Sequence, residues 1–133
     1  MSRVKRLRFT RLPEAGVIDE SRQPVFRVLD GRPELLPPHL PPAEALMVAV
    51  HRGYCPSGGY SVRVQEVLDK HDVVEVRVLL RDPDPQEFVT TVVTEPKDVI
   101  VLDKRQLQKR GKRLFRFVDQ NGRELSRQET VLD

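Results

Sequence analysis

The sequence predicts a mainly β fold: a single small domain with an antiparallel sheet, one short helix and a C-terminal hairpin. A length of 133 residues suits one domain with one hydrophobic core, so residues 1–133 are expected to fold together. Apolar and polar residues alternate in several runs, which is the period of a strand with one exposed face. Eleven prolines and seven glycines separate these runs, as turns separate strands.

The first expected strands lie in the amino-terminal third of the chain. Leu7 and Phe9 alternate with basic residues, and the run 25–29 ends at an Asp-Gly turn. Five prolines between residues 33 and 42 predict an extended connection. The run 46–50 is apolar throughout, which indicates a central strand that is covered on both faces.

The middle of the chain predicts a hairpin. Valines alternate with polar residues in 60–65 and 73–80, and the link between these runs is short, so they are expected to pair antiparallel. The Asp-Pro-Asp-Pro segment 82–85 ends the second run, because proline donates no backbone hydrogen bond. Two further β-branched runs, 88–94 and 99–102, are also expected to be strands, which gives about six to eight strands in all.

The carboxyl-terminal part predicts a short helix and then a hairpin. The helix is expected from about 104 to 110, because Asp103 can cap it and Gln106 can complete a capping box. The Asn-Gly pair at 121–122 lies between two strand-like runs and is a strong signal for a two-stranded hairpin.

Basic residues are concentrated in two segments of the chain. Residues 1–11 hold five Lys or Arg and residues 104–117 hold seven, and neither segment contains Asp or Glu, although the net charge is only +3. Such segregation predicts a basic face, which attracts a polyanion. The candidate polyanion contacts are Lys104, Arg105, Lys109, Arg110, Lys112, Arg113 and Arg116.

A second interpretation of the same charges is that they keep exposed edge strands soluble. Phe115 and Phe117 flank Arg116 at strand spacing, so they are expected to point into the core instead of stacking on bases. A nucleic-acid-binding protein is therefore the alternative function, and core packing is the preferred role for both rings.

No arrangement of residues predicts catalysis or a metal or cofactor site. His39, His51 and His71 are isolated from one another and have no metal-ligand spacing. Cys55 and His51 could form a thiolate–imidazole pair, but four strand residues separate them by about 13 Å, so a passive thiol is expected. We expect a protein that is not an enzyme. One cysteine and no signal-like apolar start favour a cytoplasmic protein.

The segment from about 47 to 104 resembles the PrcB C-terminal domain family. An apolar strand leads to Gly53, the family's Pro-Thr-Gly-Gly-Tyr type of turn has its counterpart in residues 56–60, and Asp-Pro-Asp-Pro and a Val-Ile-Val strand follow. The remainder, 104–133, is a basic helix and hairpin extension outside the resemblance. The candidate interaction loop is Pro56, Ser57, Gly58, Gly59 and Tyr60.

The resemblance implies a non-catalytic protein-interaction or accessory module of the protease-complex-subunit type. Its partner would be another protein, either a protease or a second copy of the chain, and neither a membrane nor a cofactor is implied. The glycines of the candidate loop also have a purely structural interpretation, because adjacent glycines allow a sharp bend before the strand that begins near Tyr60.

Overall fold

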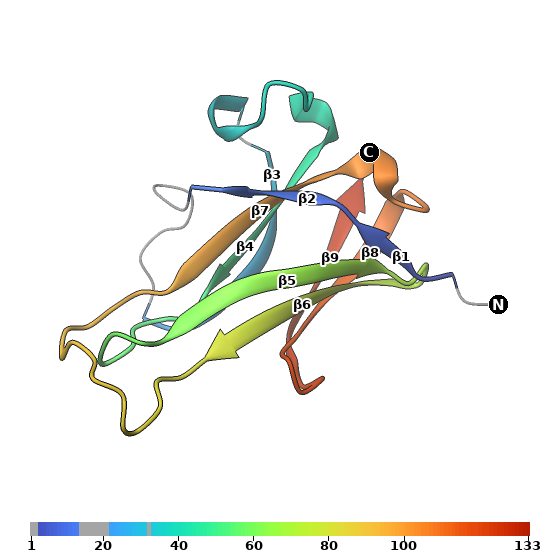
Figure 1. The fold of residues 1–133 in the computed structure, drawn as a ribbon. Helices are drawn as coiled ribbons and strands as arrows, with labels where there is room; N and C mark the ends of the chain where they lie inside the picture. The colour runs from blue at the N-terminus through green and yellow to red at the C-terminus, as the bar shows by residue number, and fades with distance from the viewer. Residues whose placement is uncertain (1–2, 14–21, 32) are drawn as a thin grey trace.

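The computed structural model describes residues 3–13, 22–31 and 33–133, and in these ranges nine strands form two sheets packed face to face (Figure 1). Turns of 3-10 helix occur among the described residues, but no α-helix does. The mainly β prediction is therefore confirmed. The strands are β1 (Lys5–Leu7), β2 (Phe9–Leu12), β3 (Val25–Asp30), β4 (Ala45–His51), β5 (Ser61–Asp69), β6 (Val73–Arg81), β7 (Lys97–Asp103), β8 (Gly111–Val118) and β9 (Glu124–Leu132).

The strands are divided between a five-stranded sheet in the order β1-β5-β6-β8-β9 and a four-stranded sheet in the order β2-β7-β4-β3. Both predicted hairpins, β5–β6 and β8–β9, are present and antiparallel. The sequence predicted an antiparallel sheet, but β6 and β8 run parallel. Parallel neighbours need a crossover connection, and here β7 in the opposite sheet supplies it.

The main core lies between the two sheets. Val48 and Ile100 of the smaller sheet pack with Val76, Phe115 and Phe117 of the larger sheet, and all five side chains are inaccessible to solvent. The prediction that both phenylalanines are core residues is confirmed. All seven residues of β4 are buried, as expected for the central strand.

The outer face of the smaller sheet is covered by the proline-rich segment. This segment contains two 3-10 turns, η1 (Pro33–Leu35) and η2 (Pro42–Glu44), where an extended connection was expected. Its leucines pack on the outward-facing side chains of β4 and β7, so these strands are buried on both faces. The second cluster contains Leu12, Leu40, Ala45, Met47, Ala49, Val99 and Val101, with Leu29, Leu35 and Leu36 packed against it.

The predicted helix at 104–110 is wrong in type and length. Only the 3-10 turn η3 (Lys104–Gln106) forms, although Asp103 caps it as expected and accepts a hydrogen bond from the Arg105 amide at 3.0 Å. Leu107 has an extended backbone and packs in the main core, which ends the turn after three residues. A seven-residue helix is also too short to stabilise itself.

The predicted strand at 88–94 is also wrong. Thr94 forms a single β-bridge with Cys55, and the rest of the run is loop. The β-branched residues Val92 and Val93 are exposed and have no strand beside them to pair with. The next strand, β7, starts only after Pro96.

Three glutamine side chains pair with backbone groups of residues that they do not neighbour in sequence. In each pair the amide oxygen accepts from a backbone N–H and the amide nitrogen donates to the carbonyl of the same residue, as a neighbouring strand would. These glutamine clamps connect segments that no strand pairing joins. The pairs are Gln106 with Arg8 (2.7 and 2.8 Å), Gln120 with Leu80 (3.1 and 2.7 Å) and Gln128 with Val28 (2.9 and 3.0 Å).

The backbone groups of Val64, which lies beside a bulge in β5, are likewise bound by side chains, here those of an ion pair. Arg11 Nε is 3.0 Å from Asp98 Oδ1, Arg11 Nη2 donates to the Val64 carbonyl at 2.6 Å, and the Val64 amide donates to Asp98 at 2.8 Å. The pair joins β2 and β7 of one sheet to β5 of the other. Arg11 of the basic amino-terminal segment therefore has a structural role.

Candidate functional site

Two loops meet at one end of the sandwich, and we call residues 53–60 and 82–96 together the loop end (Figure 1). The first loop contains the candidate interaction loop, and the second connects β6 to β7. Backbone hydrogen bonds join them: Gly58 N to Thr90 O, Cys55 N to Thr94 O and Thr94 N to Cys55 O, each at 2.9 Å. The two loops therefore support each other.

Gly59 is required by the close approach of the two loops. Its φ of +88° lies in the left-handed region, and a Cβ there would stand 2.7 Å from Pro83 Cβ and 2.9 Å from Val89 Cγ1. A Cβ on Gly58 would lie 2.7 Å from Thr90 Oγ1. Both glycines thus serve the geometry of the turn, as the structural interpretation of the loop expected.

Two arginine side chains contact both loops of the loop end. Arg52 donates to the Arg81 carbonyl at 2.6 Å, forms an ion pair with Asp82, and places its guanidinium 5.0 Å from the centre of the Tyr60 ring. Arg81 donates to the Gly59 carbonyl at 2.8 Å. The end of the first loop and the start of the second are therefore tied to the same pair of side chains.

The outer part of the loop end is apolar and exposed. The Phe88 ring is fully exposed, and Val92 and Val93 are 58% and 61% exposed. The backbone before Phe88 is ordered by Asp84, which accepts from the Gln86 amide through its side chain (2.9 Å) and from a second amide through its carbonyl. The structure thus presents an aromatic ring on a braced loop.

Sequence reasoning missed this surface because it assigned the residues around Phe88 to a strand. The candidate loop itself, 56–60, supports the surface more than it forms it, since Gly58, Gly59 and Tyr60 are only partly exposed. A usable signal was the position of Phe88, which follows the two prolines of 82–85 and so lies just beyond a strand end.

Cys55 and His51 lie close to Gly53 but have separate partners. His51 is buried, accepts from the Gly53 amide at 2.8 Å through Nδ1, and contacts Glu95 at 3.2 Å through Nε2. Burial raises the pKa of the Cys55 thiol; the charge of Arg52 opposes this rise and that of Asp82 reinforces it. Both imidazole nitrogens are engaged by other groups, and the thiol favours its protonated, weakly nucleophilic form.

We expect Cys55 to react at least about tenfold more slowly with a thiol reagent in the native protein than in concentrated guanidinium chloride, because only an accessible thiolate reacts. The rate at which Cys55 releases the coloured thiolate from a chromogenic disulfide reagent at neutral pH measures its reactivity. A variant with Cys55→Ser and Val131→Cys is the control, since residue 131 is exposed on β9 and its thiol should react fast in the native state. Equally fast native reaction of Cys55 would contradict a passive role.

The candidate polyanion contacts are largely occupied by protein groups. The Arg113 and Lys104 side chains are buried, and Lys104 donates to the Ala43 carbonyl at 3.2 Å. Lys109 is exposed. The remaining members form ion pairs: Arg105 with Asp103 (2.7 Å), Arg110 with Glu44, Lys112 with Glu129 (3.4 Å) and Arg116 with Glu124 (2.9 Å). Carboxylates therefore neutralise much of the charge that the sequence places in 104–117.

Arg113 forms a fully buried ion pair with Asp69. Arg113 Nη2 lies 2.7 Å from Asp69 Oδ1, and neither side chain has any exposed surface. Burial alone would raise the pKa of Asp69, but hydrogen bonds from Arg113 and from the amides of Gln108 and His71 outweigh it and hold the pKa below its ordinary value. The pair fixes the end of β5 to β8.

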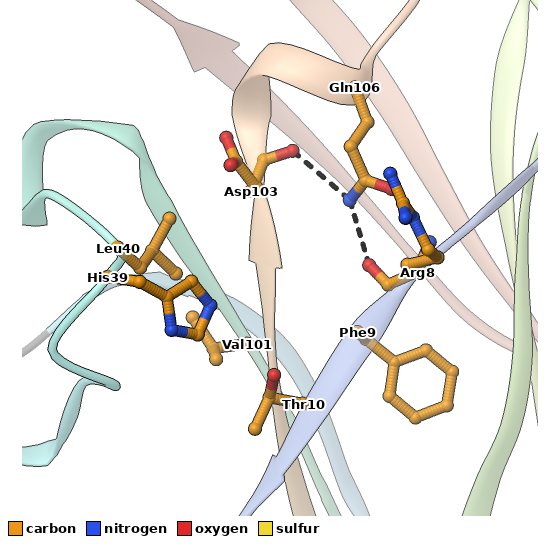
Figure 2. Close-up of a pocket in the computed structure, with 8 residues that line it drawn as sticks. All are labelled: Arg8, Phe9, Thr10, His39, Leu40, Val101, Asp103 and Gln106. Carbon is orange, nitrogen blue, oxygen red and sulfur yellow. Dashed lines mark hydrogen bonds between the residues drawn. The ribbon is translucent and has the colours of Figure 1, made fainter.

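A cavity of about 340 Å³ lies between the proline-rich segment and the paired strands β2 and β7 (Figure 2). Gln106 closes one side, where it donates to the Arg8 carbonyl at 2.8 Å and the Asp103 carbonyl at 3.3 Å. The residues that line the cavity are Arg8, Phe9, Thr10, His39, Leu40, Val101, Asp103 and Gln106. One histidine and one carboxylate do not make a metal site, and no group of metal-ligating residues occurs in the described part of the chain.

Residues 46–103 match the family described as PrcB C-terminal, which confirms the resemblance seen in the sequence. Neither the curated proteins nor the solved structures include a significant match. Among the described residues, no helix has the length and apolarity to cross a bilayer. The chain thus matches the PrcB C-terminal family over residues 46–103, the segment that supplies β4 to β7 and both loops of the loop end.

Proposed function

We propose that the protein is a non-catalytic interaction or accessory module of the protease-complex-subunit type, which binds a protein partner through the loop end. The observation that carries the proposal is the fully exposed Phe88 ring on a loop held by hydrogen bonds and ion pairs. The PrcB C-terminal match supports it, because both loops of the loop end lie inside the matched segment.

The chemistry of the surface suits protein recognition. A phenylalanine ring supplies a large apolar area, and a few aromatic anchors commonly provide most of the binding energy of an interface. The loop is already ordered by Asp84 and by the ion pair between Arg81 and Glu87, so binding need not order it. A lower ordering cost raises affinity.

We expect Phe88→Ala to weaken partner binding at least about tenfold, because the ring is the anchor. Wild-type protein and variants are immobilised and exposed to a lysate of the source organism, and the captured proteins are quantified by mass spectrometry. The most strongly captured protein is then purified, and its affinity is measured by calorimetric titration. Val131→Ala, which truncates an exposed apolar side chain on β9, is the matched control and should bind as wild type does.

A loss of stability would not explain a difference in binding, because an exposed side chain contributes little to stability and both variants should melt as wild type does. A purified partner that binds Phe88→Ala and wild type with equal affinity would remove the loop end from the proposed function.

A further inference from the structure

We propose that the partner of the loop end is a second copy of this chain, whose hollow between β3, β6 and β9 receives Phe88. This inference rests on the proposed function, since it names the occupant of the same surface. The hollow has a volume of about 430 Å³. It is lined by Pro24, Phe26, Arg52, Leu80, Arg123, Glu124 and Leu125.

The hollow suits an aromatic ring in size and polarity. Phe26, Leu80 and Leu125 are partly buried at the margin of the main core, so the floor of the hollow is apolar. Its volume lies in the range of about 300–1,000 Å³ that is typical of small-molecule pockets, and a single phenylalanine side chain needs less. Insertion of Phe88 would remove two apolar surfaces from water at once.

The charges around the ring and the hollow are complementary. Glu124 at the rim is already paired with Arg116 and Arg127, and Arg52 is paired with Asp82. Within the described residues, the Arg123 guanidinium has no hydrogen bond or ion pair.

On the loop side, Asp84 lies four residues before Phe88. Its carboxylate accepts only from the Gln86 amide among the described residues. An ion pair between Asp84 of one copy and Arg123 of the other would therefore join two groups that form no salt bridge among the described residues, although the charge of Asp84 also acts on Arg81.

The positions of Phe88 and of the hollow allow a closed dimer. Leu80 lines the hollow and the second loop begins two residues later, so the hollow lies beside the loop end. A two-fold axis beside this end lets each copy insert Phe88 into the other, which forms the contact twice and leaves no open surface for a third copy. A buried aromatic side chain contributes about 150–250 Å². Two inserted rings therefore bury far less than the about 1,600 Å² of a standard interface, so a weak, micromolar dimer is expected.

Sedimentation equilibrium of the full chain from about 1 to about 500 µM tests the dimer, because this range brackets a micromolar dissociation constant. Wild type and Val131→Ala should show a monomer–dimer equilibrium, and Phe88→Ala should raise the dissociation constant at least about tenfold. Wild type that stays monomeric over the whole range, or a Phe88→Ala variant that dimerises as wild type does, overturns the inference.

Charge reversal identifies the hollow as the receiving site. Asp84→Arg and Arg123→Glu should each weaken the dimer, and the double variant should dimerise more tightly than either single variant, because the ion pair is restored with its direction exchanged. It should stay weaker than wild type, because the hydrogen bond from the Gln86 amide to Asp84 is lost. Melting curves of the three variants verify that each is folded. A double variant no stronger than either single variant overturns the assignment of Arg123 as the contact of Asp84.

The same experiments separate this inference from the proposed function. A monomeric wild type, together with a captured protein that binds wild type but not Phe88→Ala, removes self-association and leaves the interaction module. A monomeric wild type with no Phe88-dependent partner removes both.

Discussion

Replacement of Arg113 by methionine is expected to lower the free energy of unfolding by about 3–5 kcal/mol. The substitution keeps a long apolar stem but removes the only side-chain cation that touches Asp69 among the described residues. The Asp69 carboxylate then stays buried with backbone amides as its remaining donors. Removal of one partner of a buried ion pair is costly because it leaves an uncompensated charge.

Urea unfolding at neutral pH measures the loss. Lys112→Met is the matched control: Lys112 lies on the same strand, is exposed and pairs with the exposed Glu129, so its replacement should cost about 1 kcal/mol or less. Equal losses for the two variants would show that the buried pair contributes no more than a surface pair.

The effect of Arg113→Met should depend on pH. In wild type the pKa of Asp69 lies below its unfolded value, so its contribution to stability is present above the unfolded pKa of about 3.9 and is lost as the pH falls through the lowered pKa. Without the hydrogen bond and charge of Arg113, the pKa of Asp69 is higher than in wild type, so the variant gains less stability as the pH rises. The difference between the two proteins should therefore be largest at neutral pH and shrink below about pH 4.

Gly59→Ala is expected to cost about 2–4 kcal/mol, which exceeds the usual cost of a side chain at positive φ. The added Cβ would lie 2.7 Å from Pro83 Cβ and 2.9 Å from Val89 Cγ1, so the two loops would have to separate. Gly122→Ala is the matched control, because Gly122 also has positive φ but no atom lies within 4 Å of the added Cβ. Its cost should be about 1 kcal/mol.

Thermal and urea unfolding of both glycine variants measure the difference, which isolates the contact between the loops from the backbone conformation. Equal costs would show that the loops separate freely, and the loop end would then not be a preorganised surface.

The parts of the fold that the sequence predicted are those governed by local pattern. The apolar run of β4 and the two hairpins follow from alternation and turn residues, which are short-range properties. The run 88–94 has strand composition but lies between prolines and has no available edge, and pairing is a long-range property. The parallel pairing of β6 with β8 depends on where β7 lies, which no local pattern reveals.

The candidate site was predicted only in part for the same reason. The turn at 56–60 was identified from its residues, but the exposure of Phe88 depends on how two distant loops pack. The buried pair left a signal: Arg113 shares the inward face of β8 with Phe115 and Phe117, as the spacing of two requires. An arginine on that face needs a buried acidic partner, and that partner could have been sought.

The glutamine clamp at Val28 protects an edge of the smaller sheet against pairing with another molecule. β3 is the outermost strand of its sheet, and the Gln128 amide occupies both the N–H and the C=O at the middle of its free side. A strand from another molecule would have to displace that amide before it could extend the sheet. Growth into β-linked fibrils from this edge of the smaller sheet is thereby impeded.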